Sequence, residues 1–389
     1  MSQPRIIVFA HKPPPHHGQS QMVQFLVDGL SDGTRGVSIF HINARFSSGA
    51  QDIGSLRWGK LYPLVGYVWS AWKARFAGGY SIFYYVPAPA KRSALYRDWL
   101  VMGLCRWAFP HLILHWHAVG LGRWVSQEAR PWERWLTRRA LGGAAMSISL
   151  SQLTSADAAV LRPRKQTVVA NGILDPVPDY ANGLAAVRQQ RREAIQNALD
   201  RKGGESLEVS VLFLALCSRD KGVFDALETI QSANRMLHQR DCPVRFRLVV
   251  AGEFVKLGDR TEFDRLNCLH PVATIHGFLD GPGKETVFRA ADIFLFPTFY
   301  ANEGQPLNLV EAMAWGLPIV TTRWRAIPEL LPEGYPAITA PRDVEGMAVL
   351  MVRLFDQNLS QILRRRFEEK FTVNRHLDAM AAALRTSLD

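Results

Sequence analysis

Cysteine is scarce in this chain, and no two cysteines are close together. The four residues are Cys105, Cys217, Cys242 and Cys268, and they form no C-x-x-C pair. A disulfide framework or a cysteine-based zinc site needs paired cysteines at short spacing. The pattern therefore predicts reduced, buried thiols in a cytosolic protein.

Long apolar runs are absent as well. The longest candidates, such as residues 209–217, are no longer than a strand, whereas a membrane-spanning helix needs about 20 apolar residues. The first residues lead directly into a predicted strand, so we expect no signal peptide. No G-x-G-x-x-G motif follows that strand, which weighs against a nicotinamide-binding enzyme. The shortness of the apolar runs argues against a chain that crosses a bilayer.

What is present is an ordinary globular composition in 389 residues, 48% hydrophobic and 21% charged, long enough for two domains. Short apolar runs alternate with helical stretches, a pattern that predicts parallel, doubly wound sheets and an α/β fold. The expected strands of the first half are 5–11, 36–43, 80–86, 111–118, 146–151 and 166–170. Those of the second half are 209–216, 245–251, 274–277, 293–297, 318–322 and 337–339.

The polar segment 176–206 separates the two halves. It contains an expected helix at Leu184–Leu199 between the turn-forming sequences PVPD and KGGES. We interpret 1–175 as an N-terminal Rossmann-like domain, 176–206 as the linker and 207–372 as a C-terminal Rossmann-like domain. A last helix, at about 373–389, could pack back on the first domain. Two Rossmann-like domains facing each other across a cleft are the simplest architecture.

Positive charge and tryptophan are concentrated in the first half. Residues 1–174 contain 20 Lys/Arg and 7 Asp/Glu, and nine of the eleven tryptophans. Tryptophan beside arginine and lysine on helices favours the interface of an anionic membrane. The alternative is that most of these tryptophans are core residues and the arginines a solvated face. Nucleic acid would also attract the charge, but no helix-turn-helix, zinc finger or RNA-binding signature is visible.

One stretch, 296–320, organises the second half. It contains a strand end, a polar loop with Glu303 and Gly304, a helix from Asn308 that ends at Gly316, and a further strand. Such a β-α-β unit places its loop at the carboxyl end of a parallel strand, where open α/β sheets bind ligands. Glu311 lies among apolar residues of this helix, so its carboxylate should face a cleft. The helix N-terminus is suited to a phosphate.

Histidines offer weaker candidates in the first half. Gly18 opens a helix after the loop that carries His11, His16 and His17, and we interpret these histidines as solvated rather than as metal ligands. His115 and His117 end a strand two residues apart, so they share a face. A two-histidine zinc site is conceivable there, but no third ligand is visible. We favour His117 as a hydrogen-bonding group for a polar substrate.

Two further loops follow strands of the second half. Lys221 and Gly222 stand where a loop enters a helix, and a lysine there can meet a diphosphate or be an ordinary first-turn surface residue. The backbone of Gly277, Phe278 and Leu279 is a plausible edge for contacting a nucleotide base.

Five segments together carry a family likeness: ANGI (170–173), KGVFD (221–225), GFL (277–279), ADIFLFPT (291–298) and EGQPLNLVEAMAWGLPIV (303–320). They resemble retaining glycosyltransferases of the GT-B fold, in the glycogen-synthase and mannosyltransferase-like group often called family 4. The likeness covers nearly all of the second half. In the first half it rests on Gly18, His117 and the pair Asn171 and Gly172.

The resemblance implies a nucleotide-diphosphate sugar donor, retention at the anomeric carbon, and no metal or other cofactor. By position, Glu303 would orient the hydroxyls of the donor sugar, His117 would contact the sugar from the other domain, and Lys221 would neutralise the diphosphate. Glu311 would accept hydrogen bonds from the ribose. The remaining implied donor contacts are Gly18, Arg219, Phe278 and the amides of Gln305, Pro306, Leu307 and Asn308.

The chain departs from this family at Leu216, where an arginine often provides a second cation on the diphosphate. Arg219 could substitute from the loop. Positive charge and N–H dipoles at the leaving oxygens would then replace a metal.

We therefore expect an enzyme that moves a sugar to an acceptor held by the N-terminal domain. The expected acceptor is a lipid-linked saccharide or a lipopolysaccharide or exopolysaccharide precursor. The expected location is the cytoplasm, with peripheral association at the inner face of the cytoplasmic membrane. The alternative is a non-catalytic GT-B-like scaffold of a polysaccharide assembly complex, although Glu303, Glu311 and Lys221 together argue against it.

Overall fold

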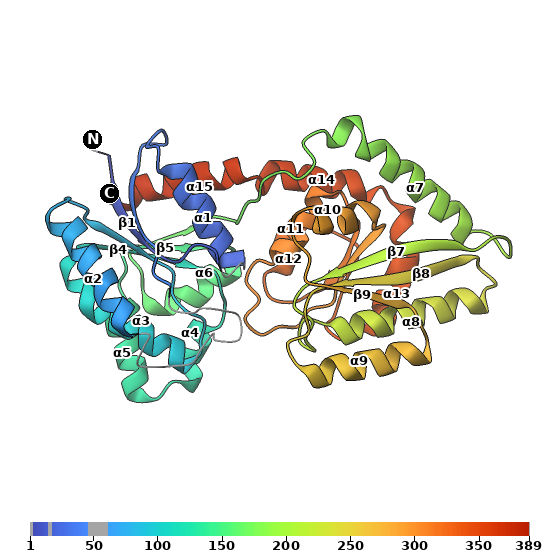
Figure 1. Ribbon diagram of the computed structural model, residues 1–389, viewed down its shortest axis with the longest axis horizontal. Helices are drawn as coiled ribbons and strands as arrows, with labels where there is room; N and C mark the ends of the chain where they lie inside the picture. The colour runs from blue at the N-terminus through green and yellow to red at the C-terminus, as the bar shows by residue number, and fades with distance from the viewer. Residues whose placement is uncertain (1–2, 15–17, 46–60, 389) are drawn as a thin grey trace. The chain divides into compact units, whose positions relative to one another are not determined.

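The computed structural model describes residues 3–14, 18–45 and 61–388. The chain forms two compact units (Figure 1). The first comprises Met1–Gly172, Asn302–Gln305 and Val373–Asp389, and the second comprises Ile173–Ala301 and Pro306–Thr372. The first unit thus includes a short loop that lies in sequence between the two segments of the second unit, and the C-terminal helix, which follows the second unit.

The first unit contains a six-stranded sheet in the order β2-β1-β3-β4-β5-β6, and all its strand pairs are parallel. The order reverses between β1 and β3. The strand bounds are β1 Arg5–Phe9, β2 Ser38–Ile42, β3 Ile82–Tyr85, β4 His111–Trp116, β5 Met146–Ser149 and β6 Lys165–Val168.

Both faces of this sheet are covered by helices. On one face α1 (Gly18–Leu30) packs against α15 (Val373–Arg385). On the other face α2 (Leu61–Phe76), α3 (Arg92–Cys105) and α5 (Pro131–Leu141) form a second layer (Figure 1). The shorter elements are η3 (Arg106–Ala108), α4 (Leu121–Arg123), η4 (Trp124–Glu128), α6 (Gln152–Ala158), η5 (Ala159–Leu161) and η8 (Thr386–Leu388).

The second unit has its own parallel sheet, in the order β12-β11-β10-β7-β8-β9. The order reverses between β7 and β10, which are neighbours. The bounds are β7 Leu207–Leu214, β8 Val244–Ala251, β9 Ala273–Gly277, β10 Ile293–Phe296, β11 Ile319–Thr322 and β12 Ile338–Thr339. All twelve strands predicted from the apolar runs are confirmed, with ends shifted by one or two residues.

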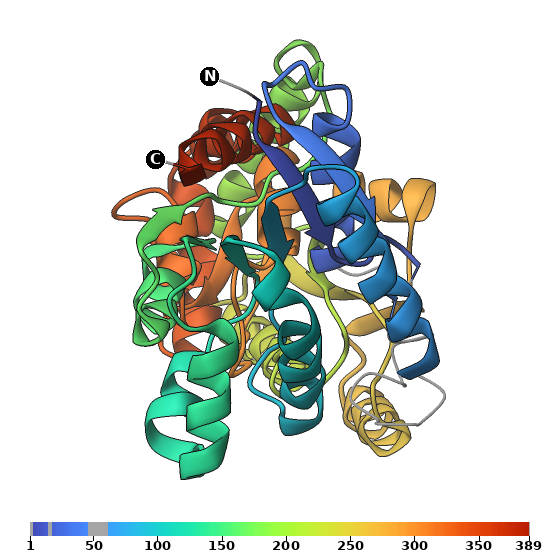
Figure 2. The same ribbon diagram turned by 90° about the vertical axis from the view of Figure 1, so that its left-hand side faces the viewer.

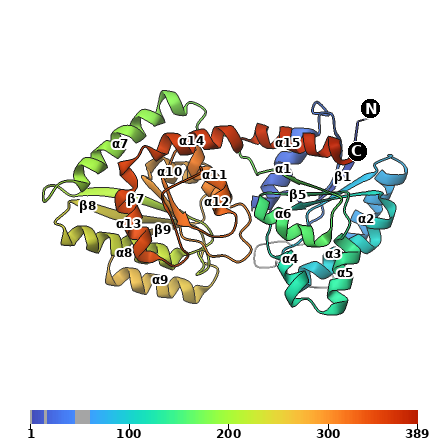
Figure 3. The ribbon, with the colours of Figure 1, turned by 180° about the vertical axis from the view of Figure 1, so that it is seen from behind.

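Helices again cover both faces of the second sheet (Figures 1 and 3). On one side α11 packs against α14, and α14 against α7; on the other α8 packs against α13. The bounds are η6 Tyr180–Asn182, α7 Leu184–Leu199, α8 Val223–Gln239, α9 Leu257–Leu269, α10 Gly281–Ala290, α11 Leu307–Ala314, α12 Ile327–Leu330, α13 Val344–Arg353, η7 Leu354–Asp356 and α14 Leu359–Lys370.

The segment 176–206, interpreted from the sequence as a linker, contains η6 and α7 and is part of the second unit. Two arginines of α7 fasten it there. Arg191 donates through Nε to Asp292 Oδ1 at 2.9 Å, and Arg188 donates to the carbonyl oxygen of Phe288 at 2.9 Å. The helix predicted at Leu184–Leu199 is confirmed with the same bounds.

Three of the four cysteines are buried free thiols, as expected, but Cys268 on α9 is exposed. The prediction for Cys268 was wrong because the buried residues of α9, Asp259 and Phe263, lie in its first two turns, whereas Cys268 is near its exposed C-terminal end. Among residues 3–14, 18–45 and 61–388, we find no helix whose length and apolar character would suit it to cross a membrane.

Candidate functional site

The reversal of strand order in the second sheet brings two loops together. The carboxyl ends of β7 and β10 are adjacent, and the helices that follow them leave to opposite faces. The amide of Phe299, after β10, donates to the carbonyl oxygen of Asp220, after β7, at 2.8 Å. In open α/β sheets, a switch point of this kind is where ligands bind.

Lys221 stands at this switch point. Its Nζ lies 4.7 Å from the ring centroid of Tyr300 and 5.7 Å from that of Phe296, so aromatic faces hold the ammonium in place. Gly222, the next residue, has a φ of +86°, and a Cβ there would lie 2.3 Å from the carbonyl oxygen of Pro297. The loop can approach β10 this closely because residue 222 has no side chain.

Helix α11 begins beside this loop. The amide group of the Asn308 side chain donates to the carbonyl oxygen of Leu214, the last residue of β7, at 2.7 Å. The N–H groups of Leu307 and Asn308 belong to the first turn, where no intrahelical partner exists. The predicted cradle of amides from Gln305 to Asn308 needs one correction: Pro306 has no N–H and cannot donate.

Glu311 of α11 forms an ion pair that the sequence did not reveal. Its Oε1 accepts from Lys284 Nζ of α10 at 2.5 Å, and its side chain is 16% exposed. We expected this carboxylate to face a cleft because burial without a partner is costly, and Lys284 now provides a partner. The two residues are 27 positions apart, and no local pattern indicates their pairing.

Arg219 and Phe278, the other donor contacts predicted in the second unit, lie on different loops. The guanidinium of Arg219 pairs with Asp259 of α9 at 3.1 Å and also with Glu262. The charge of Arg219 is therefore compensated within the protein. Leu216, which stands where the resembled family often has an arginine, is exposed. Phe278 directly follows β9, and its ring is exposed. The donor-contact roles of Arg219 and Phe278 stay predictions.

In the first unit, His115 and His117 lie on the same side of the chain at the end of β4. Their ring centroids are 4.2 Å apart. His115 is buried and bonded through Nδ1 to the hydroxyl of Tyr84. Burial holds the pKa of His115 well below its ordinary value and raises that of Tyr84, so both groups are neutral at neutral pH. The ring of His117 thus packs against the neutral ring of His115.

The loop Asn302–Gln305 packs on this part of the first unit. The side-chain Oε1 of Gln305 accepts from the amide of Asn171 at 2.8 Å, and its Nε2 donates to the Asn171 carbonyl oxygen at 3.3 Å. A Cβ on Gly304 would lie 2.4 Å from the carbonyl oxygen of His117. Glu303, between these contacts, is buried. Glu303 is therefore next in the chain to a glycine that packs against the backbone of His117. The roles of Glu303 and His117 at a donor sugar stay predictions.

Gly18 is the first residue of α1 and is exposed. His16 and His17 lie outside the described residues. Within the part of the chain that the structure describes, we find no group of three or more His, Cys, Asp or Glu residues with the geometry of a metal site.

A third histidine, His376 of α15, is buried in the first unit. Its Nδ1 donates to the carbonyl oxygen of Ala170 at 2.7 Å, and burial lowers its pKa to about 4. The unfolded chain binds a proton at this residue near pH 6.5, whereas the folded chain does not until about pH 4. The stabilisation that comes from keeping His376 neutral is therefore fully present above the unfolded pKa, and it is lost as the pH falls toward the folded pKa.

We predict that this residue alone lowers the free energy of unfolding by about 3 kcal/mol between about pH 7.5 and about pH 4. Urea denaturation at a series of pH values measures the effect. His376→Asn, which keeps a donor for Ala170, should flatten the dependence, whereas the exposed His238→Asn should not. If the free energy of unfolding falls equally with pH in wild type and in His376→Asn, the prediction is contradicted.

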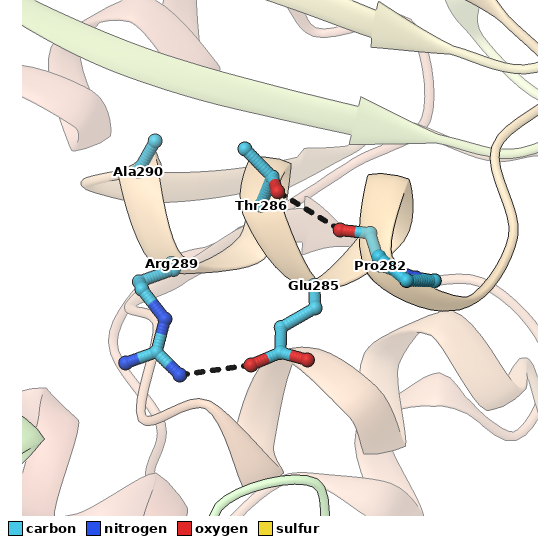
Figure 4. A pocket seen from close by; sticks show the side chains of 5 residues that line it. All are labelled: Pro282, Glu285, Thr286, Arg289 and Ala290. Atoms are coloured by element: carbon cyan, nitrogen blue, oxygen red, sulfur yellow. Dashed lines mark hydrogen bonds and ion pairs between the residues drawn. The ribbon is translucent and has the colours of Figure 1, made fainter.

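A surface depression along α10 carries no comparable chemistry. Figure 4 shows its lining, in which Arg289 donates to Glu285 at 2.9 Å and Thr286 donates to the Pro282 carbonyl oxygen at 2.8 Å. These polar groups are bonded to one another along one helix. We assign no ligand to it.

Comparisons with known proteins identify proteins similar to this chain. Residues 208–357 match the family model described as Glycosyl transferases group 1. The amylovoran biosynthesis glycosyltransferase AmsK of Erwinia amylovora is 30% identical over 156 residues, 37% of this chain and 35% of that protein. The MMP alpha-(1->4)-mannosyltransferase of Mycolicibacterium hassiacum is 26% identical over 285 residues, 70% of this chain and 64% of that protein.

The alignments thus span between about a third and two thirds of these relatives' lengths. The crystal structure of Anabaena Alr3699/HepE in complex with UDP-glucose is similar over 98% of this chain and 100% of that one, with a TM-score of 0.64 and 16% identity. The chain therefore has the α/β, two-Rossmann-unit fold of GT-B proteins, and its second unit matches the group 1 glycosyl transferases over residues 208–357.

Proposed function

We propose that this chain is a glycosyltransferase of the retaining, metal-independent, family 4-like kind, which uses a nucleotide-diphosphate sugar as donor. The observation that carries the proposal is the switch point of the second sheet. Lys221 and the start of α11 lie there, in the segment that matches the glycosyl transferase group 1 model. A half-buried cation beside a helix N-terminus is suited to a diphosphate.

Each group then has a task in the transfer. The bond between the anomeric carbon and the diphosphate oxygen breaks, a bond to the acceptor hydroxyl oxygen forms, and the hydroxyl proton leaves with the departing diphosphate or to solvent. Lys221 and the N–H groups of Leu307 and Asn308 stabilise the charge that develops on the leaving group. Glu311, held by Lys284, accepts from the ribose hydroxyls.

Glu303 and His117 serve the sugar. The buried carboxylate of Glu303 orients the sugar hydroxyls, and His117, supported by the neutral His115, donates or accepts a hydrogen bond on the same sugar. Orientation of this kind lowers the barrier by fixing the reacting geometry before reaction.

For the acceptor we propose a lipid-linked saccharide or an exopolysaccharide precursor at the cytoplasmic face of a membrane. AmsK, by its name, acts in amylovoran biosynthesis, and the basic, tryptophan-rich composition of residues 1–174 suits a lipid surface. The scaffold alternative has no observation in its favour, because Lys221, Glu303 and Glu311 are all present.

A thermal-shift panel of UDP-, GDP- and ADP-sugars tests the donor proposal. One nucleotide series should raise the unfolding midpoint by about 5 °C or more, because a ligand at about 100 times its Kd stabilises the fold by about 2.7 kcal/mol. The corresponding free sugars are the control and should have no effect. If none of the nucleotide-diphosphate sugars raises the unfolding midpoint, the proposal is contradicted.

A further inference from the structure

Several large apolar side chains of the first unit are exposed on one helical layer. Trp69 and Phe76 of α2 are 66% and 64% exposed, Trp107 of η3 is 65% exposed, and Trp135 of α5 is 64% exposed. Trp116 and Trp124, in contrast, are buried in the core. Among the residues that the structure describes, the tryptophans of this unit are thus either buried, partly buried, as Trp72 and Trp99 are, or exposed.

The exposed residues belong to elements that touch one another. The ring centroid of Trp107 lies 6.2 Å from that of Phe76, which joins α2 to η3. Across the layer, Trp132 of α5 lies 5.8 Å from Trp99 of α3, ring to ring. Figures 1 and 2 show α2, α3 and α5 side by side. An exposed apolar surface of this extent indicates a binding partner.

The exposed charges of the same layer are positive. The ranges 61–76, 91–108 and 130–141 contain two, four and four Lys/Arg, and their acidic residues are Asp98 and Glu133. Both of these carboxylates are buried. Asp98 accepts from the Tyr85 hydroxyl at 2.7 Å, and Glu133 accepts from Arg92 at 2.9 Å. A partner of the layer therefore meets aromatic rings and positive charge together.

We propose that the α2–α3–α5 layer is the surface with which this protein docks on an anionic lipid bilayer. The indole and phenyl rings would enter the headgroup region, and the cations would meet acidic headgroups. This inference deepens the proposed function, on which it rests for the nature of the acceptor, by locating the membrane contact on particular helices.

Charge and shape favour a bilayer over other partners. A second copy of the chain would place the same cations against one another, which costs free energy. Single-stranded nucleic acid is bound in grooves where bases stack on aromatic rings, whereas Trp69, Trp107 and Trp135 project from the outer side of separate helices. A wide surface with rings and cations interspersed is suited to a lipid interface.

Vesicle flotation tests the proposal. Wild type should float with vesicles of phosphatidylcholine containing about 30 mol% phosphatidylglycerol, and binding to pure phosphatidylcholine should be at least about tenfold weaker. Tryptophan emission should shift to the blue on binding. The triple variant Trp69→Ser, Trp107→Ser, Trp135→Ser should lose the blue shift and reduce partitioning at least about tenfold. Lys73→Glu, Arg138→Glu, Arg139→Glu should also reduce partitioning by at least that factor.

Matched controls lie on the second unit. Val187→Ser, Leu269→Ser, Ile362→Ser removes exposed apolar side chains there, and Arg201→Glu, Lys202→Glu, Arg240→Glu reverses exposed cations. Both should float like wild type. The thermal shift with the donor nucleotide should persist in every variant, so loss of docking is distinguished from failure of the donor site.

Three outcomes would overturn the proposal. One is a wild type that does not float with the anionic vesicles at low salt. The second is layer variants that float as well as wild type. The third is a protein that binds a single-stranded oligonucleotide, or forms a dimer that the tryptophan variants abolish, but does not bind vesicles.

Discussion

Replacing Lys221 with alanine is expected to lower kcat/KM for sugar transfer by about 100- to 1,000-fold. The ammonium, held over Tyr300 and Phe296, is the cation that we assign to the leaving diphosphate. Removing one preorganised group that stabilises charge in a transition state has an effect of this size. The donor-induced thermal shift should also shrink, because the diphosphate loses its charge partner.

Lys202→Ala is the matched control for this prediction. Lys202 is exposed and precedes β7, so it lies at the amino end of the second sheet, away from the switch point. Lys221→Arg should restore part of the nucleotide binding because the charge is kept. If Lys221→Ala is folded and transfers sugar at the wild-type rate, the assignment of the diphosphate site is wrong.

Replacing Glu303 with glutamine should slow sugar transfer for a different reason. The amide has nearly the shape of the carboxylate, so the buried loop between Asn302 and Gln305 should stay folded. The sugar hydroxyls would lose a charged acceptor, and misplacement of a substrate can cost about 100-fold or more in rate. We expect a loss of at least about 100-fold in kcat, with binding of the nucleoside diphosphate unchanged.

The two variants therefore separate the sugar from the nucleotide. Lys221→Ala weakens the response to the nucleoside diphosphate itself, whereas Glu303→Gln weakens only the response to its sugar-bearing form. Glu333→Gln, an exposed position in the loop before β12, is the control. A Glu303→Gln variant with wild-type kcat would exclude the role assigned to this carboxylate.

The sequence alone was sufficient for the strands and for the switch-point loops. Central strands are the clearest in the sequence, because both of their faces are buried: β3 (IFYY) and β10 (IFLF) are apolar and buried at every position. The position of Lys221 at a strand end follows from the same pattern. Gly316 has a φ of +61° and ends α11 as predicted, because the left-handed conformation there favours glycine.

Contacts between residues far apart in sequence could not be predicted in this way. Lys284 of α10 and Glu311 of α11 form an ion pair in the second unit, and Lys284 in the sequence resembles an ordinary surface charge. The clamp of Gln305 on the backbone of Asn171 joins positions 134 residues apart. The exposure of Trp69 and the burial of Trp116 depend on which helix or strand face each residue occupies.

The most direct test of the central claim measures transfer of a radiolabelled sugar to an extract of lipid-linked saccharides. The donor is the nucleotide sugar that raises the unfolding midpoint in the thermal-shift panel. Our account predicts that the wild type labels a lipid-soluble product and that the double variant Lys221→Ala, Glu303→Gln labels none, although it folds. A wild type that binds the donor but transfers no sugar, or a double variant that labels the product equally well, would contradict the account and favour a non-catalytic scaffold.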